Sequence, residues 1–381
     1  ILLPKLISLA STVLIALLLF NWMRNQNRSY SLLAVMLFCT IPQAGFLASS
    51  SKPDMTGMLF MLAALRLFFS FINSRMTRDL VLSGVIWGLA VGSKYIFGFY
   101  LIGFFLALLF FKPLPFKRKI VVYAVIAILV FLMMMPWFIK NTVMTGNPLY
   151  PYLNSIFKSD HWSESQGESF SKGIRRGGSH AILKYLYYPL ELFLKPYKYG
   201  ITAVYGVLLL LFLPFLLFGR KDAEIRMIQA TALLSFILIL PFAMVPRYFL
   251  PAFLLLSIPV AFSSTSIIQS HRILRRYFPL VLGLLVSINL IMQVSLQERQ
   301  YQGFAYLTFK LKHRNNPSVK YLYTLPYYRA VEYLNAKMGP EKQVLFVGED
   351  RTFYMKKSFL ASSFNDHNLL KIFDHLEDFK P

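Results

Sequence analysis

Acidic residues are scarce in this sequence of 381 residues, which has 17 Asp and Glu against 40 Lys and Arg. Only 15% of the residues are charged, whereas about a quarter are charged in a soluble domain, and this excludes an ordinary soluble globular fold. The single cysteine, Cys39, lies in an apolar stretch, so an intrachain disulfide is impossible. The sequence opens at Ile1, directly in an apolar stretch, and we expect the beginning of the protein to be missing from it.

Long apolar stretches accompany this shortage of charge. Hydrophobic residues make up 56% of the sequence, and they form blocks close to the length of about 20 residues that a helix needs to cross a bilayer. We therefore predict an α-helical polytopic membrane protein with about ten transmembrane helices in this fragment. The expected spans are 2–22, 30–49, 55–73, 80–93, 96–111, 120–138, 201–219, 227–245, 249–267 and 278–296.

The basic residues predict the orientation of these spans. A net charge of +23 in a soluble protein would suggest a nucleic-acid partner, but here the cations gather in alternate short loops, as the positive-inside rule describes. We expect no nucleic-acid partner, and we place five loops in the cytoplasm. Their basic residues are Arg24, Arg28, Arg75, Arg78, Lys112, Lys117, Arg118, Lys119, Arg220, Lys221, Arg226, Arg272, Arg275 and Arg276, whereas the short opposite loops have only Lys52, Lys94 and Arg247.

The apolar run 80–111 is too long for one helix without a steep tilt. Both of its flanks are basic, so the chain must cross the membrane an even number of times. A continuous helix would also leave Lys94 in mid-membrane, at a cost of several kcal/mol. We predict two short helices that separate at Gly92-Ser93-Lys94.

Two longer segments are expected on the periplasmic side of a bacterial inner membrane. The first is a loop, 139–200, within a transmembrane domain of residues 1–296; its part 171–180 is typical of a mobile loop, and its aromatic part 185–199 is typical of the membrane interface. The second is a periplasmic α/β domain, 297–381, which we expect to be truncated before its final strand. It has an expected helix between Thr324 and Gly339, a strand at 344–347 and a last amphipathic helix with Leu369, Leu370, Phe373 and Leu376 on one face.

Three charged residues at the predicted periplasmic surface are candidates for a site. Asp54 is the first of only two acidic residues before Asp160, and it is either a helix N-cap or a carboxylate that takes a proton from a hydroxyl acceptor. Lys94 follows a glycine-rich helix face, Gly84, Gly88 and Gly92, which favours close approach of another helix. Lys94 and Arg247 either extend to the membrane surface or bind a phosphate.

A dense group of aromatic and amide side chains follows the predicted span 120–138. Trp137 is a natural interface anchor, and Gly146-Asn147-Pro148 is a turn. These features predict a rigid, hydrogen-bonding loop at the periplasmic surface. The candidate substrate-binding residues are Lys94, Lys140, Asn141, Asn147, Tyr150, Tyr152, Arg247 and Tyr248, with Asp54 as a candidate catalytic residue.

Metal use is not determined by the sequence. The six histidines are scattered, and none pairs with a carboxylate at the spacing of metal ligands. His161 and His180 lie in the predicted periplasmic loop, so a divalent metal is an open possibility and no cofactor is certain.

Several of these segments, taken in order, resemble the bacterial branch of the glycosyltransferase C superfamily, which includes protein O-mannosyltransferases and the aminoarabinose transferase of lipid A. The most specific are Gly88–Tyr95 and Thr145–Pro151; the others are 1–29, Ser49–Arg75, Gly84–Tyr95, Trp137–Tyr152 and Arg247–Pro251. The tail resembles the family's periplasmic α/β domain. The resemblance implies that the main catalytic aspartate lies upstream of Ile1, and that Asp54 corresponds to a second acid of the outer loops.

The resemblance also implies an inverting sugar transfer from a polyprenyl-phosphate-linked donor to a lipid, glycan or protein acceptor at the periplasmic face. Membrane lipids would surround the donor's tail. Two alternatives stay open: a transporter or flippase for lipid-linked sugars, and a non-catalytic polysaccharide-assembly protein. A transporter needs a polar path through the bilayer, but Arg66 is almost the only ionisable residue within the predicted spans.

Overall fold

The computed structural model describes residues 2–23, 28–110, 114–159, 167–168, 182–195, 204–218, 222–301, 328–339, 342–346 and 355–361. The chain divides into two compact units, of which the first comprises residues 1–136 and 171–301 and the second residues 137–170 and 302–381. The predicted mobile stretch 171–180, the histidines His161 and His180 and the predicted last helix of the tail lie outside the described residues.

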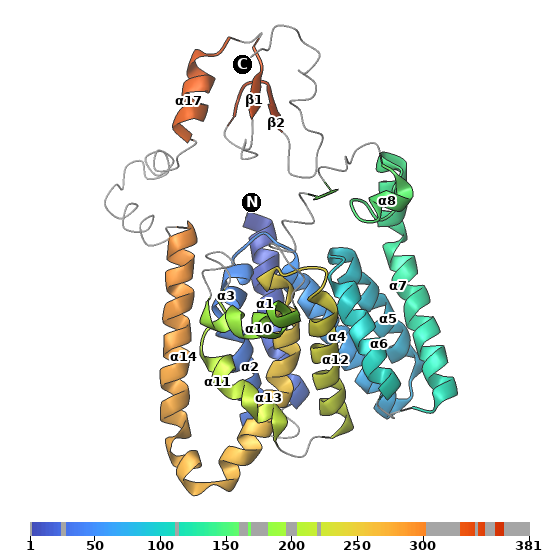
Figure 1. Ribbon diagram of the computed structural model, residues 1–381, viewed down its shortest axis with the longest axis vertical. Helices are drawn as coiled ribbons and strands as arrows, with labels where there is room; N and C mark the ends of the chain where they lie inside the picture. The colour runs from blue at the N-terminus through green and yellow to red at the C-terminus, as the bar shows by residue number, and fades with distance from the viewer. Residues whose placement is uncertain are drawn as a thin grey trace. The chain divides into compact units, whose positions relative to one another are not determined.

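The first unit is a bundle of apolar helices (Figure 1). Its elements are α1 (Leu2–Met23), α2 (Arg28–Cys39), α3 (Pro42–Ala48), α4 (Asp54–Ser74), α5 (Thr77–Ser93), α6 (Phe97–Phe110), most of α7 (Phe116–Thr145), α10 (Ile182–Leu194), α11 (Leu208–Phe212), η2 (Leu213–Leu217), α12 (Ala223–Ile239), η3 (Pro246–Tyr248), α13 (Leu250–Ser270) and α14 (Arg272–Tyr301).

Each predicted span overlaps a helix or a pair of helices among the described residues, but the predicted number of about ten transmembrane helices is not confirmed. Among the described residues, five helices are long and apolar enough to cross a membrane: α1, α4, α7, α13 and α14. A sixth span results if α2 and α3, which meet at a bend of 74°, are counted together. The helices α5, α6 and α12 have 17, 14 and 17 residues. The structure therefore confirms a polytopic helical membrane protein.

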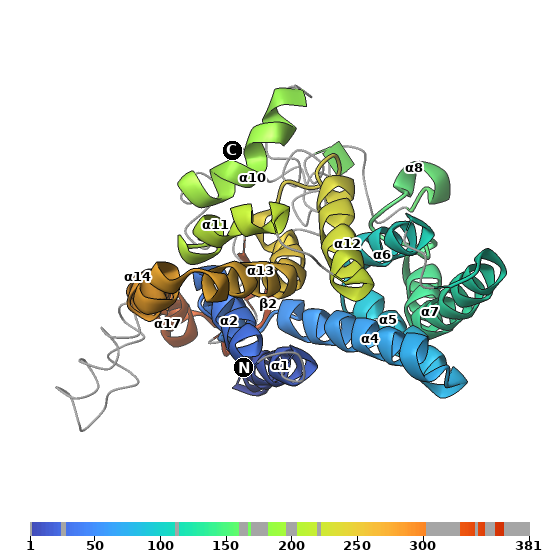
Figure 2. The same ribbon diagram turned by 90° about the horizontal axis from the view of Figure 1, so that it is seen from below.

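Helix α13 forms the centre of the bundle, with α2, α4, α12 and α14 packed around it (Figure 2). Its residues from Leu250 to Ala261 are all buried, and small side chains such as Ser257, Ser263 and Ser264 keep the surrounding helices close. A helix that is apolar on every side is stable only when neighbours cover every side. An outer helix such as α14 instead exposes an apolar surface, including Leu280, Leu284 and Ile291.

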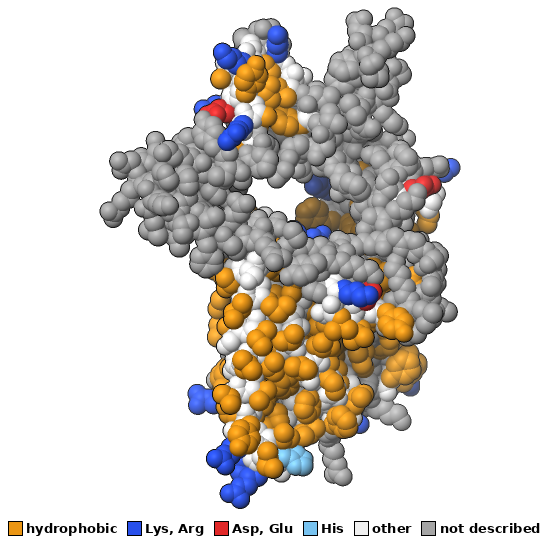
Figure 3. Space-filling view, turned by 60° about the vertical axis from the view of Figure 1, so that its left-hand side comes forward, with side chains coloured by type: hydrophobic (Ala, Val, Ile, Leu, Met, Phe, Trp, Pro, Cys, Tyr) orange, Lys and Arg blue, Asp and Glu red, His pale blue; other side chains and the backbone are white. Residues whose placement is uncertain are grey.

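The surface of the first unit has the pattern expected of a membrane protein. Hydrophobic side chains cover the face seen in Figure 3, and Lys and Arg gather at its lower end. Arg272, Arg275 and Arg276, in the first turns of α14, are exposed. Apolar side chains are stable in contact with lipid tails, whereas cations are stable at the end of the bundle, where it leaves the bilayer core.

The glycines of α5 lie against α7, as their spacing predicted. A Cβ atom added to Gly84 would meet the side chain of Leu129 at 2.7 Å, and one added to Gly88 would meet that of Met133 at 2.5 Å. The backbone of α7 is within 3.3 Å of the first position and 3.2 Å of the second. Small residues at i and i+4 therefore allow the two helices to approach closely.

The second unit contains α8 (Asn154–Phe157), α17 (Tyr328–Lys337) and two short strands, β1 (Val344–Phe346) and β2 (Phe359–Ala361). The strands are parallel, with Val344 opposite Phe359 and Phe346 opposite Ala361. The described helix, Tyr328–Lys337, and the first strand lie within the ranges that the sequence predicted, and Thr324 lies outside the described residues.

Candidate functional site

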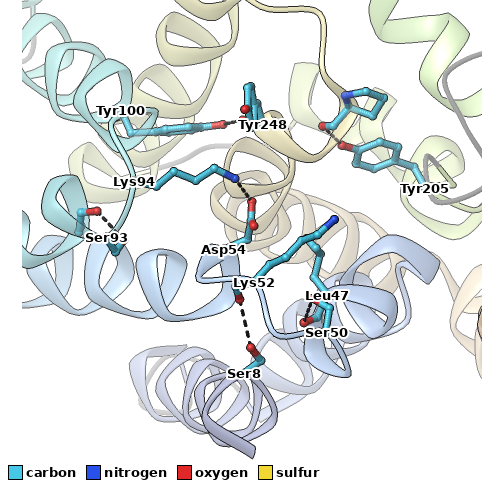
Figure 4. Close-up of polar contacts among 12 residues, drawn as sticks. Ser8, Leu47, Ser50, Lys52, Asp54, Ser93, Lys94, Tyr100, Tyr205 and Tyr248 are labelled. Carbon is cyan, nitrogen blue, oxygen red and sulfur yellow. Dashed lines mark hydrogen bonds and ion pairs between the residues drawn. The ribbon is translucent and has the colours of Figure 1, made fainter. Parts of the chain in front are cut away.

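The site is built where three short connections meet at one end of the first unit. The loop before α4 carries Lys52 and Asp54 follows it, the break between α5 and α6 carries Lys94, and η3 carries Arg247 and Tyr248. The ammonium nitrogen Nζ of Lys94 lies 2.6 Å from Oδ1 of Asp54 (Figure 4). The structure thus brings together two of the side chains that the sequence singled out.

Lys94 reaches this position because α5 ends immediately before it. Its backbone is extended, and its N–H donates to the carbonyl oxygens of Ala90 and Val91, which closes the last turn of the helix. Phe97 then begins α6, with its N–H donating to the carbonyl oxygen of Lys94 at 3.0 Å. The predicted break at Gly92-Ser93-Lys94 is therefore present, and it directs the lysine side chain toward Asp54 rather than into lipid.

Asp54 is the first residue of α4, but its carboxylate caps no backbone group of that helix. The residue at the N-cap is Pro53, which makes no side-chain capping hydrogen bond. Asp54 is 5% exposed, and its second oxygen, Oδ2, is buried with no hydrogen-bond partner among the residues that the structure describes. The positive end of the helix dipole stabilises a carboxylate at this position. The Asp54 side chain points toward Lys94, however, because the two form an ion pair.

Two cations lie near the same aromatic ring. Lys94 Nζ is 4.7 Å from the ring centroid of Tyr248, and the guanidinium of Arg247 is 5.5 Å from it. Nε of Arg247 is buried and has no hydrogen-bond partner in the described part of the chain. The face of an aromatic ring attracts a cation, but it does not neutralise the charge.

The lysines of the site lose part of their hydration. Burial lowers the pKa of Lys94; the charge of Asp54 raises it, and the charges of Arg247 and Lys52 lower it further. Burial also lowers the pKa of Lys52, Arg247 lowers it further, and Asp54 raises it. Three cations therefore share one carboxylate in a partly buried place.

Two buried tyrosines hold η3 in position, and sequence reasoning did not identify either of them. The hydroxyl of Tyr100 donates to the carbonyl oxygen of Tyr248 at 2.7 Å and accepts from the N–H of Ala252 at 3.1 Å. The hydroxyl of Tyr205 donates to the carbonyl oxygen of Pro246. These partners are far apart in sequence, so no local motif reveals them. Lys52 also belongs to this group of charged residues, although the sequence indicated only that it lies in a short periplasmic loop.

The remaining predicted residues belong to the second unit, where they organise one loop. Asn147 is fully buried; its side-chain amide donates to the carbonyl oxygen of Tyr152 at 2.8 Å, and its Oδ1 accepts from the N–H of Leu149 at 2.9 Å. Asn141 donates to the carbonyl oxygen of Pro148 at 3.2 Å. The predicted rigid loop is present, and its asparagines serve its own backbone.

Lys140 and the tyrosines of this loop are more accessible. Lys140 Nζ lies 5.3 Å from the ring centroid of Trp137. Tyr152 is 44% exposed, and Tyr150 is half-buried. Within the part of the chain that the structure describes, no group of three His, Cys, Asp or Glu residues is arranged to hold a metal ion.

Both the sequence and the fold of this chain are similar to those of known proteins. Residues 4–139 match the family described as dolichyl-phosphate-mannose-protein mannosyltransferase. The fold matches the crystal structure of ArnT from Cupriavidus metallidurans bound to undecaprenyl phosphate, with a TM-score of 0.53 and 14% identity over 95% of this chain and 72% of that chain. The apo structure of the same ArnT gives a TM-score of 0.53 and 15% identity over 94% and 71% of the two chains. No curated protein matches the sequence.

The helical bundle therefore defines a polytopic membrane protein with a fold like that of ArnT. The part of the chain from α1 to most of α7 is thus similar to a mannosyltransferase family, and the fold is similar to that of ArnT.

Proposed function

We propose that this protein is a membrane glycosyltransferase that moves a sugar from a polyprenyl-phosphate donor to an acceptor of the cell envelope. The observation that carries the proposal is the excess of positive charge around Asp54. Lys94 pairs with Asp54, the charges of Lys52 and Arg247 both act on Lys94, and Arg247 Nε is buried without a hydrogen-bond partner among the described residues. A charge near the bilayer core is costly unless it is paired, so such a cluster favours a site that an anion completes.

The phosphate of a lipid-linked sugar is an anion suited to this position. Its polyprenyl chain remains in the membrane while the phosphate reaches the ends of the helices. The family match and the fold of an undecaprenyl-phosphate-binding enzyme support the same ligand class. Charge-assisted hydrogen bonds to such a phosphate contribute about 1.5–3 kcal/mol each.

The proposed reaction is an inverting transfer. An acceptor hydroxyl attacks the anomeric carbon of the sugar, a new carbon–oxygen bond forms, and the bond to the phosphate oxygen breaks. The electron pair of that bond remains on the polyprenyl phosphate, where the cations stabilise it. We assign to Asp54 Oδ2, which has no hydrogen-bond partner among the described residues, the task of accepting a hydrogen bond from the acceptor hydroxyl, as a second acid beside the main catalytic aspartate, while Lys94 holds Oδ1.

The arrangement in the membrane is part of the proposal. We propose that all ten helical segments cross a bacterial inner membrane, with the Asp54 site, the loop 139–200 and an α/β tail from residue 297 at the periplasmic face. Lys140, Asn141, Asn147, Tyr150, Tyr152 and Tyr248 are proposed to contribute to substrate binding. The sugar is a hexose or pentose, and the acceptor is a lipid, a glycan or a protein.

The test uses the full chain in proteoliposomes with a panel of synthetic polyprenyl-phosphoryl sugars and an envelope extract as acceptor source. We expect release of polyprenyl phosphate with transfer of the sugar, and loss of transfer in Asp54→Asn. Lys117→Met, an exposed change at the start of α7, is the control for loss of one charge. Movement of an intact donor between bilayer leaflets without cleavage would instead support the transporter.

A further inference from the structure

The missing side chain of Gly57 leaves a notch in the buried face of α4, beside the break between α5 and α6. A Cβ atom added to Gly57 would lie 2.1 Å from Cε2 and 2.6 Å from Cζ of Phe97, and 2.6 Å from Oγ of Ser93. Non-bonded carbon atoms have their optimal separation at about 3.5–4.0 Å. The Phe97 ring therefore occupies space that a side chain at position 57 would need.

This notch lies about one helical turn from the ion pair of the site. Asp54 and Gly57 are at positions i and i+3 of α4, and residues at this spacing lie on one face of a helix. On the other side, the N–H of Phe97 donates to the carbonyl oxygen of Lys94 at 3.0 Å. The ring in the notch and the ion pair are therefore neighbouring contacts between the same two segments.

The Phe97 ring has little freedom to leave the notch. Phe97 is 1% exposed, and its ring centroid lies 6.1 Å from that of Tyr100. Tyr100 is itself held by the hydrogen bond from its hydroxyl to the carbonyl oxygen of Tyr248 (Figure 4). Because protein interiors are closely packed and transmit strain, a side chain at position 57 would displace the α5–α6 break rather than the ring alone.

We infer that Gly57 is a positioning residue of the site: it admits the Phe97 ring and thereby sets the distance between Asp54 and Lys94. This inference rests on the proposed function, in which Lys94 holds one carboxylate oxygen while the other accepts a hydrogen bond from the acceptor hydroxyl. Gly57 touches no reacting group, and its effect on transfer passes through the ion pair.

The distances show how small a displacement would break the pair. To reach an ordinary van der Waals separation from an added methyl group, the Phe97 ring must move by about 1 Å or more. Lys94 Nζ and Asp54 Oδ1 are 2.6 Å apart, and hydrogen bonds to nitrogen donors extend to about 3.2 Å. A shift of this size would therefore separate the ammonium from the carboxylate, and a misplacement of about 1 Å at a reacting centre can cost about a hundredfold in rate.

The experiment measures kcat and KM for sugar transfer by the full chain in proteoliposomes, well below the unfolding temperature of each variant. We expect Gly57→Ala to lower kcat by about ten- to hundredfold although the protein is folded. Gly84→Ala is the matched control. Its Cβ atom would meet Cδ1 of Leu129 in α7 at 2.7 Å, but Gly84 lies about 15 Å before Lys94 along α5. Gly84→Ala should lose thermal stability and keep kcat within about threefold of wild type.

A compensating change at Phe97 separates positioning from a general packing defect. Phe97→Leu removes Cε2 and Cζ, the two ring atoms nearest to the added methyl group. Phe97→Leu alone should lower kcat, because it leaves the notch partly empty. The double variant Gly57→Ala/Phe97→Leu should have a higher kcat than either single variant. If Gly57→Ala does not fold, the comparison of Phe97→Leu with the double variant decides.

A crystal structure of Gly57→Ala, or of Phe97→Leu in its place, provides a readout that does not depend on transfer. It should show Lys94 Nζ more than about 3.5 Å from Asp54 Oδ1. An intact ion pair, an unchanged kcat in Gly57→Ala, an equal loss in Gly84→Ala or a double variant no better than the single ones would overturn the inference and leave the proposed function standing. Absence of transfer by wild type from every donor would overturn the proposed function, and the distance in the variant would still decide whether Gly57 sets the pair.

Discussion

The hydroxyl of Tyr100 donates a 2.7 Å hydrogen bond to the carbonyl oxygen of Tyr248, and this contact ties α6 to the connection that carries Arg247. Tyr100 is fully buried, and its hydroxyl also accepts from the N–H of Ala252 in α13. One side chain therefore satisfies two backbone groups where η3 meets the first turn of α13. The position of Arg247 depends on a residue outside its own loop.

Tyr100→Phe is expected to destabilise the protein and to disturb the site. The change leaves a buried carbonyl and a buried N–H without this partner, which costs about 1–3 kcal/mol. Thermal unfolding in a fixed detergent measures the stability, and binding of farnesyl phosphate, a short polyprenyl phosphate, measures the site. Tyr277→Phe, at an exposed position of α14, is the control. Unchanged stability and binding in Tyr100→Phe would show that the hydrogen bonds to η3 are not required.

Gly88→Ala is expected to loosen the contact between α5 and α7. The new Cβ atom would lie 2.5 Å from Cβ of Met133 and 3.2 Å from Cα of Val130, so the helices must separate. Overpacking of this kind costs about 1–3 kcal/mol, whereas alanine in place of glycine gains up to about 1 kcal/mol of helix propensity. We expect a net loss of thermal stability.

A matched control is available in the neighbouring helix. A Cβ atom added to Gly98 in α6 would meet no atom within 4 Å. Gly98→Ala should therefore keep the gain in helix propensity without the clash. If the two alanine variants unfold at the same temperature, the close approach of α5 and α7 does not contribute to stability.

The sequence predicted the order and position of the helices well because their signal is local. Apolar blocks and basic loops are properties of neighbouring residues, and the break at Lys94 follows from the length of one run and the cost of burying one charge. The glycine face of α5 was also visible, but the sequence did not indicate that its partner is α7.

Contacts between distant segments were not predictable in this way. Asn289 is buried in α14, and its Oδ1 accepts the N–H of Val207 at 2.9 Å at the start of α11. It also lies against Gly206, whose φ of 75° favours glycine. The roles of Asn289, Tyr100 and Lys52 depend on three-dimensional packing, for which no periodicity provides a signal.

We expect binding of farnesyl phosphate to weaken at a lower pH than it would if Lys52 had the ordinary pKa of a lysine. Burial lowers the pKa of Lys52 from its ordinary value of 10.5, so the ammonium loses its proton and its charge below that pH. Affinity should therefore fall as the pH rises through this lowered pKa. The phosphate does not cause the change, because its second pKa is about 6.

Lys52→Arg separates this titration from other alkaline effects. Arginine keeps its charge throughout the range because its pKa exceeds about 12. The variant should bind at neutral pH and retain its affinity to a higher pH than wild type. Parallel pH profiles for wild type and Lys52→Arg would exclude Lys52 as the titrating group.

The orientation in the membrane is the last prediction, and it follows from the basic loops. Cytoplasmic loops are enriched in Lys and Arg. The basic short loops are therefore expected in the cytoplasm, and the segments 139–200 and 297–381 should both be periplasmic. In a Cys39→Ala background, single cysteines at Ser171 and Ser362 should react with a membrane-impermeant thiol reagent in intact cells. A cysteine at Lys117, which is exposed at the start of α7, should react only after lysis. The reverse pattern would place the Asp54 site at the cytoplasmic face, where a periplasmic acceptor cannot reach it, and the proposed transfer would then require a cytoplasmic acceptor.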